Sequence, residues 1–406
     1  MKFSKQYIYL DSASATYLHP SVKAAMLPFF NKNFGNPSGL HQPALKAGRA
    51  LHTAREQVAR ILNAKTEEII FTAGGSESIN LAIFGIARKF EILHKKKGHI
   101  ITTPIEHSAV LNSVEALKEE GWQISYLPVN NEGLVNIQAL GKVIQNDTIL
   151  ISIMLANNEI GTIQPITQIG KYLENLNTNR LNNKLPKIYF HTDACQAGGV
   201  LDLNVQKLKV DLMTLNGSKI YGPKQTSILY KKTNTPLRPI IFGGGQENNF
   251  RSGTENLAGI IGFATALKLA QQNRIKTNKR LRILRNYLIN TIMRSISDCV
   301  LNGPAIETDS EHLATRLPNN ANLSFKHIEG ETLLLFLDAK GIGISTGSAC
   351  HTQNPNPSHV LSAIKLPNEY IAGTARFTLS NLTTKTQLDY TVKTLQKIIS
   401  TLRQNR

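Results

Sequence analysis

The sequence predicts an α/β fold, with a mostly parallel sheet in a large domain and a smaller α/β domain after it. Short apolar runs alternate with helical stretches from Glu67 to about Tyr230, which is the order typical of parallel sheets. The chain has 406 residues, more than the roughly 250–300 at which single cores usually stop growing. Further strand and helix patterns fill the C-terminal part. We therefore expect a large domain over 15–260 and a small domain formed by 1–14 and 261–406.

The expected elements of the large domain follow one another as strand, helix and strand. The expected strands cover 68–72, 99–102, 123–127, 148–154, 187–192, 211–215 and 226–230, and the clearest helices cover 76–89 and 109–120. Ligands of such sheets bind outside the carboxyl ends of the strands. The polar residues directly after these runs are therefore the candidates for chemistry.

The C-terminal part begins with a long helical region over 257–296. It leads to a strand at 321–325, a helix at 329–339, a turn that contains a cysteine, a short helix at 359–364, a strand at 374–379 and a closing helix at 384–402. This order predicts a compact α/β unit of its own.

Composition restricts the function classes. The net charge is +18 and the pI is near 9.7, which is compatible with a polyanionic partner such as RNA. The basic residues are scattered, however, and no arginine-rich tract is interleaved with aromatics, so we do not expect direct nucleic-acid binding. No apolar run approaches the ~18 residues of a membrane span, and the first residues show no secretory apolar region. We expect a cytoplasmic protein.

The three cysteines are Cys195, Cys299 and Cys350. Their odd number and their spacing favour reduced thiols over disulfides and predict no metal site. Cys350 follows a Gly/Ser turn and precedes the polar, proline-containing stretch 352–358, where there is almost nothing to bury. This setting favours an exposed and reactive thiol.

Two charged residues end neighbouring apolar runs, Asp193 after 187–192 and Lys219 after 211–215. Each alone has an ordinary interpretation, the aspartate as a helix cap and the lysine as a solvated side chain. Together they suit a pyridoxal phosphate enzyme, in which a lysine forms a Schiff base and a carboxylate holds the pyridinium nitrogen protonated.

Two further segments, each directly after an expected strand, fit the same chemistry. Gly75 and Ser76 lie between a strand and a helix, where free amides and the positive helix end can hold a phosphate, although such residues also serve as an ordinary turn and cap. His107 follows another strand. It is either an ordinary loop histidine or a flat ring that stacks on a planar cofactor.

An ordered set of short motifs extends over nearly the whole chain. In order they are Tyr9-Leu10-Asp11, Phe34-Gly35-Asn36-Pro37, Glu106-His107, Asn157-Asn158-Glu159-Ile160-Gly161, His191-Thr192-Asp193, Lys219-Ile220-Tyr221-Gly222-Pro223-Lys224, Arg251-Ser252-Gly253-Thr254, Gly347-Ser348-Ala349-Cys350 and Arg376-Phe377. With these motifs the chain resembles the class V-type pyridoxal phosphate enzymes, and more narrowly the cysteine desulfurases of the NifS/IscS type. The resemblance implies fold type I of the pyridoxal phosphate transferases, with a seven-stranded-type sheet in the large domain.

The resemblance implies roles for individual residues around pyridoxal phosphate. The implied cofactor contacts are Lys219 as the Schiff-base lysine, Asp193 at the pyridinium nitrogen, His107 stacked on the ring, Asn158 and Gln196 near the ring oxygen, and Gly75, Ser76, Asn216 and Ser218 around the phosphate. Thr254 would reach the phosphate of a partner subunit, which implies a homodimer. Arg376, with Asn158, would bind the substrate, because a guanidinium fork matches a carboxylate.

The implied reaction converts L-cysteine to L-alanine. Lys219 would remove the Cα proton, and Cys350 would take the substrate sulfur as a persulfide and pass it to an acceptor protein. That acceptor is an iron-sulfur scaffold or a tRNA-thiolating enzyme. Family members that feed a scaffold often have a docking tail after the last helix, and this sequence ends directly after that helix, so we expect either acceptor. Alternatives are a selenocysteine lyase or cysteine sulfinate desulfinase of the same fold, against which Cys350 argues, and a non-catalytic basic RNA-associated scaffold, against which the complete residue set argues.

The chain departs from the family pattern at four positions. Asn216 and Ser218 stand where serine and histidine are common, and both can still donate hydrogen bonds to a phosphate, so these changes concern affinity rather than reaction type. Ser380 and Asn381 stand where Gly-Arg is usual.

Overall fold

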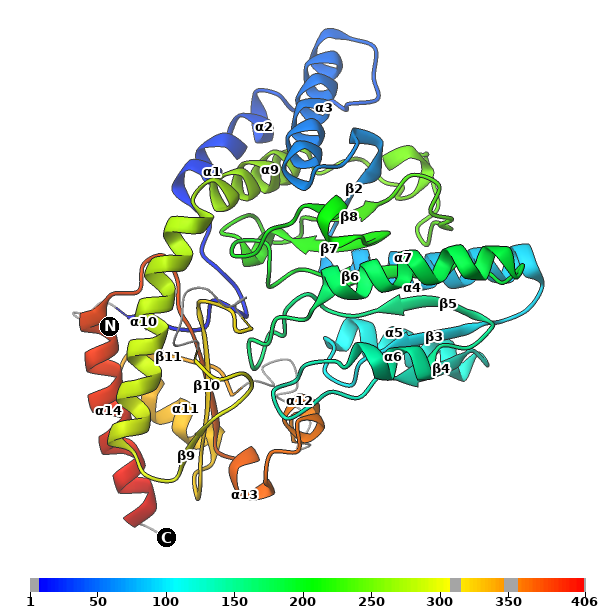
Figure 1. Cartoon of the computed structure of the whole chain (residues 1–406). Coiled ribbons are helices and arrows are strands. Elements are labelled where there is room, and N and C mark those ends of the chain that lie inside the picture. The colour runs from blue at the N-terminus through cyan, green and yellow to red at the C-terminus, as the bar shows by residue number, and fades with distance from the viewer. Residues whose placement is uncertain (1–6, 307–314, 347–356, 405–406) are drawn as a thin grey trace.

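The computed structural model describes residues 7–306, 315–346 and 357–404, and a seven-stranded sheet forms its centre (Figure 1). Only β8 runs antiparallel to its neighbours; the other pairings, among β3 to β7, are parallel. The expected mostly parallel sheet is therefore confirmed. In sheet order the strands are β2 (Ile69–Thr72), β8 (Ser227–Lys231), β7 (Leu212–Asn216), β6 (Tyr189–Asp193), β5 (Thr148–Ser152), β3 (His99–Thr102) and β4 (Gln123–Tyr126).

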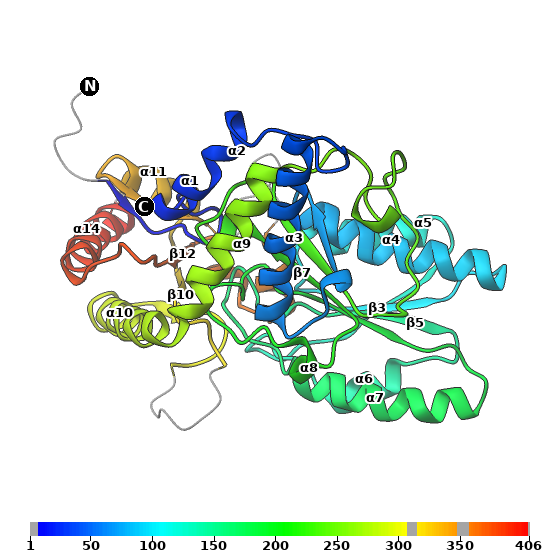
Figure 2. The same cartoon turned by 90° about the horizontal axis from the view of Figure 1, so that it is seen from above.

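Helices cover both faces of this sheet, as Figure 2 shows from above. Strands such as β2, β3 and β5 are buried on both faces, as expected of a sheet between two helical layers. The helices of this domain are α1 (Pro20–Met26), α2 (Pro28–Asn31), α3 (Gln42–Leu62), α4 (Gly75–His94), α5 (Ser108–Glu119), α6 (Ile137–Val143), α7 (Ile166–Asn182), α8 (Val205–Leu208) and α9 (Leu257–Gln272).

A smaller unit stands beside the sheet, where α10 and α14 lie side by side (Figures 1 and 2). Its antiparallel sheet has the order β12-β10-β9. Its elements are α10 (Arg274–Ser295), β9 (Cys299–Leu301), β10 (Asn320–Phe325), α11 (Gly330–Asp338), β11 (Ile342–Gly343), α12 (His359–Ala363), α13 (Asn368–Ile371), β12 (Thr374–Thr378) and α14 (Lys385–Gln404).

The start of the described chain belongs to this smaller unit. Strand β1 (Ile8–Tyr9) pairs in parallel with β11, and Ile8 and Leu10 lie in the same apolar core as Leu281, Phe325 and Leu395. The polypeptide then crosses to the large sheet through residues 11–16, so this crossing segment lies between the two cores.

The long helical region expected over 257–296 consists of two helices separated at Asn273. Asparagine is a poor helix former because its side chain competes for backbone hydrogen bonds, and here the side-chain Nδ2 of Asn273 donates to the Leu269 carbonyl in the last turn of α9 at 2.9 Å. Apolar residues of α9 pack into the core of the large sheet, whereas those of α10 pack into the second core. We propose a two-domain division that follows these cores and places all of α9 with the large sheet.

Within the residues that the structure describes, no helix is long and apolar enough to span a membrane.

Candidate active site

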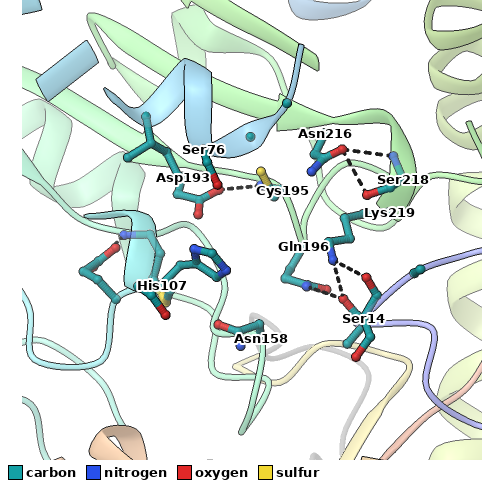
Figure 3. A pocket seen from close by; sticks show the side chains of 18 of the residues that line it. Ser14, Ser76, His107, Asn158, Asp193, Cys195, Gln196, Asn216, Ser218 and Lys219 are labelled. Carbon is teal, nitrogen blue, oxygen red and sulfur yellow. Dashed lines mark hydrogen bonds between the residues drawn. The ribbon is translucent and has the colours of Figure 1, made fainter. Parts of the chain in front are cut away.

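The carboxyl ends of β6 and β7 bring Asp193 and Lys219 into one pocket of about 640 Å³. The two strands are direct parallel neighbours, with Asp193 paired to Thr214. The expectation that these residues end adjacent strands is thus confirmed. Asp193 is 7% exposed, and its Oδ1 accepts a hydrogen bond of 2.9 Å from the amide of Cys195. A carboxylate fixed in this way presents its negative charge to the pocket from one side (Figure 3).

Lys219 lies opposite, at the end of the short 3₁₀ helix Gly217–Lys219. Its Nζ donates to the carbonyl oxygens of Ala13 at 2.8 Å and Ser14 at 2.6 Å, so the crossing segment holds the amine at the pocket wall (Figure 3). Gln196 donates from Nε2 to the same Ala13 carbonyl at 3.0 Å. The position of the amine therefore depends on a segment that lies between the two cores.

The start of α4 forms a cradle for an anion at another side of the pocket. Gly75 and Ser76 open this helix and line the pocket, and the first amides of a helix have no partner within it. A Cβ at Gly75 would come within 3.2 Å of Cys195 Sγ and Asn216 Nδ2. Glycine at this position therefore lets the helix start approach the strand ends closely.

The two unusual residues beside Lys219 form a small polar unit at this cradle. Asn216 Oδ1 accepts from both the amide and the hydroxyl of Ser218, each at 3.0 Å. Both side chains line the pocket. The Nδ2 of Asn216 is thereby directed towards the start of α4, where it can donate to an anion.

His107, Asn158 and Gln196 line the same pocket, and Figure 3 shows them around its open space. His107 caps α5, with Nδ1 accepting from the amide of Ala109 at 3.1 Å. Because Nδ1 is the acceptor, a neutral ring carries its proton on Nε2.

Arg376 brings a fixed guanidinium from β12 of the smaller unit into this pocket. Its Nη2 donates to Asp11 Oδ1 at 2.7 Å and to Ser14 Oγ at 2.9 Å, and Nη1 donates to the Asn158 carbonyl at 3.0 Å. Its Nε is buried and has no hydrogen-bond partner among the described residues. These contacts fix the orientation of the guanidinium. Its N–H groups are not all used by them.

Glu106 is a pocket residue that sequence reasoning noted only as part of a motif. It is 1% exposed, and its Oε1 accepts from Thr103 Oγ1 at 2.7 Å and from the Met154 amide at 3.0 Å. Burial raises its pKa to about 8, and the nearby charge of Asp193 adds to the rise. Glu106 therefore carries a proton at neutral pH.

We predict that Glu106→Gln stabilises the protein progressively as the pH rises. A raised pKa in the folded state means that the free energy of unfolding falls as the pH rises towards 8. The glutamine lacks this titration, so its advantage over the wild type should grow by about 2 kcal/mol between pH 6.5 and pH 8. The buried His191 does not interfere, because burial lowers its pKa to about 4 and its effect on the free energy of unfolding therefore changes below pH 6.5.

Chemical denaturation of the protein at a series of pH values measures this difference, with Glu67→Gln at an exposed position as the control. A difference between the Glu106→Gln variant and the wild type that does not change with pH would mean that the buried carboxyl does not titrate in this range.

Two of the three cysteines lie in the described residues, and neither is a ready nucleophile. Cys195 lines the pocket, but burial raises the pKa of its thiol well above the usual range. Burial also raises the pKa of the Cys299 thiol, to about 12. Both are free thiols. Cys350 lies outside the described residues.

The pocket brings together almost all of the predicted site residues that the structure describes. The exception is Thr254, which is exposed and does not line the pocket of its own chain. Sequence reasoning missed Ser14 and His359 as pocket residues, and it missed Asp11 as the partner of Arg376. For Asp11 a signal existed, because it directly follows an apolar run, whereas His359 donates to the Glu106 carbonyl at 2.9 Å through a contact that only the fold reveals.

The chemistry of the lining fits pyridoxal phosphate. The pocket offers an amine, a buried carboxylate across from it and an anion cradle with close backbone approach at Gly75. These are the groups needed for the aldehyde, the ring nitrogen and the phosphate of that cofactor. Among the described residues, no cluster of three His, Cys, Asp or Glu side chains could hold a metal ion.

Comparison with known proteins gives a consistent result. The family model described as "Aminotransferase class-V" matches residues 8–391. The chain is 47% identical to "Cysteine desulfurase IscS" of Dictyoglomus turgidum, over 98% of this chain and 96% of that protein. It is 42% identical to "Cysteine desulfurase IscS" of Methanosarcina thermophila, over 98% and 93% of the two chains. A solved structure titled "NIFS-LIKE PROTEIN" superposes with a TM-score of 0.86 at 34% identity, covering 97% of this chain and 100% of that one.

Proposed function

The chain belongs to the aminotransferase class-V family and is a pyridoxal-phosphate-dependent cysteine desulfurase, and from this premise we propose which residues carry each part of its reaction. Its architecture is fold type I of the pyridoxal phosphate enzymes. The proposal is supported above all by one observation. Lys219, Asp193 and Arg376 line a single pocket although they come from three different parts of the chain.

We assign Lys219 as the covalent anchor of the cofactor and Asp193 as the partner of its ring nitrogen. Gly75, Ser76, Asn216 and Ser218 hold the phosphate. When bound, pyridoxal phosphate supplies an electron sink that stabilises negative charge at the substrate Cα.

The protein side chains then bind L-cysteine and move its proton. Arg376 binds the substrate carboxylate with the N–H groups that do not already donate to Asp11, Ser14 or Asn158. Asn158 also lines the pocket. Lys219 takes the Cα proton at Nζ, within a pocket where the Asp193 carboxylate is fixed by the Cys195 amide. His107 covers one side of the cofactor space with its imidazole ring.

The sulfur step requires a nucleophilic thiolate. The high pKa values of Cys195 and Cys299 argue against both, so we assign the step to Cys350. Its thiolate attacks the sulfur of the substrate, an S–S bond forms as the Cβ–S bond breaks, and the carbon skeleton leaves as alanine.

Assays with three substrates test this function against its relatives. The purified protein should release alanine from L-cysteine and store the sulfur on the enzyme. Release of alanine from selenocysteine or cysteine sulfinate, together with inactivity on L-cysteine, would overturn the assignment.

We predict that Arg376→Lys raises KM for L-cysteine by roughly 10- to 100-fold while the visible absorbance of the bound cofactor stays unchanged. Lysine keeps the charge but loses the planar fork that grips a carboxylate with two bonds. Steady-state kinetics and an absorbance spectrum measure the two effects separately. An unchanged KM would remove Arg376 from the substrate site.

We also propose that the enzyme acts as a homodimer in the cytoplasm. The exposed Thr254, which does not line its own pocket, is available to a second subunit. Large apolar side chains near the start of the chain are exposed as well, Phe34 by 71% and Leu40 by 90%, and a second subunit that covered them would remove apolar surface from water. The free thiols fit a reducing compartment.

The sulfur acceptor that we propose is an iron-sulfur scaffold or a tRNA-thiolating enzyme. Persulfide transfer from the enzyme to each purified acceptor, measured in parallel, distinguishes them.

A further inference from the structure

A second cavity, of about 400 Å³, lies where the two cores meet. Its walls come from the crossing segment, from the end of α9 and from the first turns of α10, which adjoin at the top of the smaller unit in Figure 1. We call it the junction cavity. It differs from the cofactor pocket in its lining, but Lys219 and Gln196 contribute to both.

The described lining of the junction cavity contains cations and no carboxylate. Lys276 and Arg280 stand one turn apart on α10 and therefore share a face of that helix. The ion pairs of the described residues include neither of them. Among those same residues, the hydrogen-bond acceptor of Arg280 is the backbone carbonyl of Thr383. Within the part of the chain that the structure describes, no carboxylate therefore pairs with Lys276 or Arg280, and both side chains are exposed at the mouth of the cavity.

Two polar groups in the same lining lack partners. Ser12 is 6% exposed, and its Oγ has no hydrogen-bond partner among the described residues. The Oδ1 of Asn319 is also buried and without a partner. Buried polar groups in native proteins are nearly always hydrogen-bonded. Both atoms are covered by their neighbours in this structure, so an occupant of the cavity would bond to them only after a small movement of the lining.

The remaining wall is apolar and is formed in part by Val22, Ile220, Leu269 and Leu281. A ligand with a short hydrocarbon body would bury that body here. A zwitterionic amino acid, including the substrate, would leave its ammonium group without a carboxylate, and an unpaired charge in a confined site is costly.

We propose that the junction cavity binds a small organic anion that has no ammonium group. Lys276 and Arg280 bind its carboxylate or phosphate, and the apolar wall receives its hydrocarbon body. This binding would be additional to cysteine desulfuration, although the cavity shares Lys219 and Gln196 with the cofactor pocket.

An occupant of the junction cavity would also act on the catalytic lysine. Thr16 lines the cavity and donates from Oγ1 to the Ser218 carbonyl at 2.9 Å, and the neighbouring residues Ala13 and Ser14 hold the Lys219 amine. A ligand that displaces the crossing segment therefore changes the position and the hydrogen bonds of the Lys219 amine. We expect a shift in the visible absorbance of the bound cofactor when the cavity fills.

The test uses calorimetric titration of the holoenzyme with three probes. Isocaproate and isopentyl phosphate carry the same type of body on a carboxylate and on a phosphate, and leucine has the isocaproate skeleton with an added ammonium group. At least one anion should bind, and leucine should bind at least about tenfold more weakly than isocaproate. The phosphate and carboxylate arms identify which anionic group the site prefers.

Matched variants locate the binding. Lys276→Gln, alone and together with Arg280→Gln, should weaken the anion by about tenfold or more while activity without the probe stays unchanged. Lys279→Gln, an exposed position on the same helix outside the lining, should leave binding intact. Three results would overturn the proposal: neither anion binds at millimolar concentration, binding survives in the Lys276→Gln variant, or binding is lost in Arg376→Lys, which would place the anion in the cofactor pocket.

Discussion

Replacing Lys219 with alanine should remove the visible absorbance of the bound cofactor and lower alanine release from L-cysteine by at least about 10³-fold. The loss is large because one amine serves as both covalent anchor and proton acceptor, and acid–base catalysis alone contributes about 10²–10⁴-fold. The structure places this amine at the pocket wall, held by the carbonyls of Ala13 and Ser14. An absorbance spectrum and an alanine assay measure both effects.

Lys224→Ala is the matched control, because Lys224 lines the same pocket but is exposed. It should retain the cofactor absorbance and most of the activity. The reverse result, with absorbance lost in the Lys224 variant and kept in the Lys219 variant, would transfer the anchoring role to Lys224.

Cys350→Ser should abolish the persulfide and lower sulfide release to background, while cofactor binding stays intact. A serine hydroxyl does not ionise near neutral pH and is a poor nucleophile towards sulfur. Mass spectrometry of the enzyme after treatment with L-cysteine detects the added sulfur atom on its peptide.

The controls for this experiment are Cys195→Ser and Cys299→Ser. Burial raises the pKa of both thiols, so both variants should still carry the added sulfur on Cys350. Sulfur found on Cys195 in the wild type would contradict the assignment. Cys195 is the relevant competitor because it lines the cofactor pocket, where the substrate sulfur is released.

Much of this site could be predicted from local patterns. Asp193 and Lys219 each follow a short apolar run, and α/β order makes the ends of such runs converge. The start of α4 could be predicted for the same reason, because Gly75 and Ser76 separate a strand from a helix. These signals depend only on neighbouring residues.

Other features depend on distances that no local pattern contains. The pairing of Asp11 with Arg376 joins residues 365 positions apart, and the raised pKa of Glu106 results from the complete burial of its carboxyl beside Asp193. The junction cavity likewise depends on the break at Asn273, because α10 begins there and contributes Lys276 and Arg280 to the same lining as the crossing segment. The sequence over 257–296 predicts helix on both sides of this position.

The most direct test of the central claim is to map the residue that anchors the cofactor. Reduction of the holoenzyme with sodium borohydride fixes pyridoxal phosphate to its lysine, and peptide mass spectrometry then identifies that lysine. The account predicts the cofactor mass on the peptide that contains Lys219, at one per chain. The cofactor on any other lysine, or on none, would contradict it.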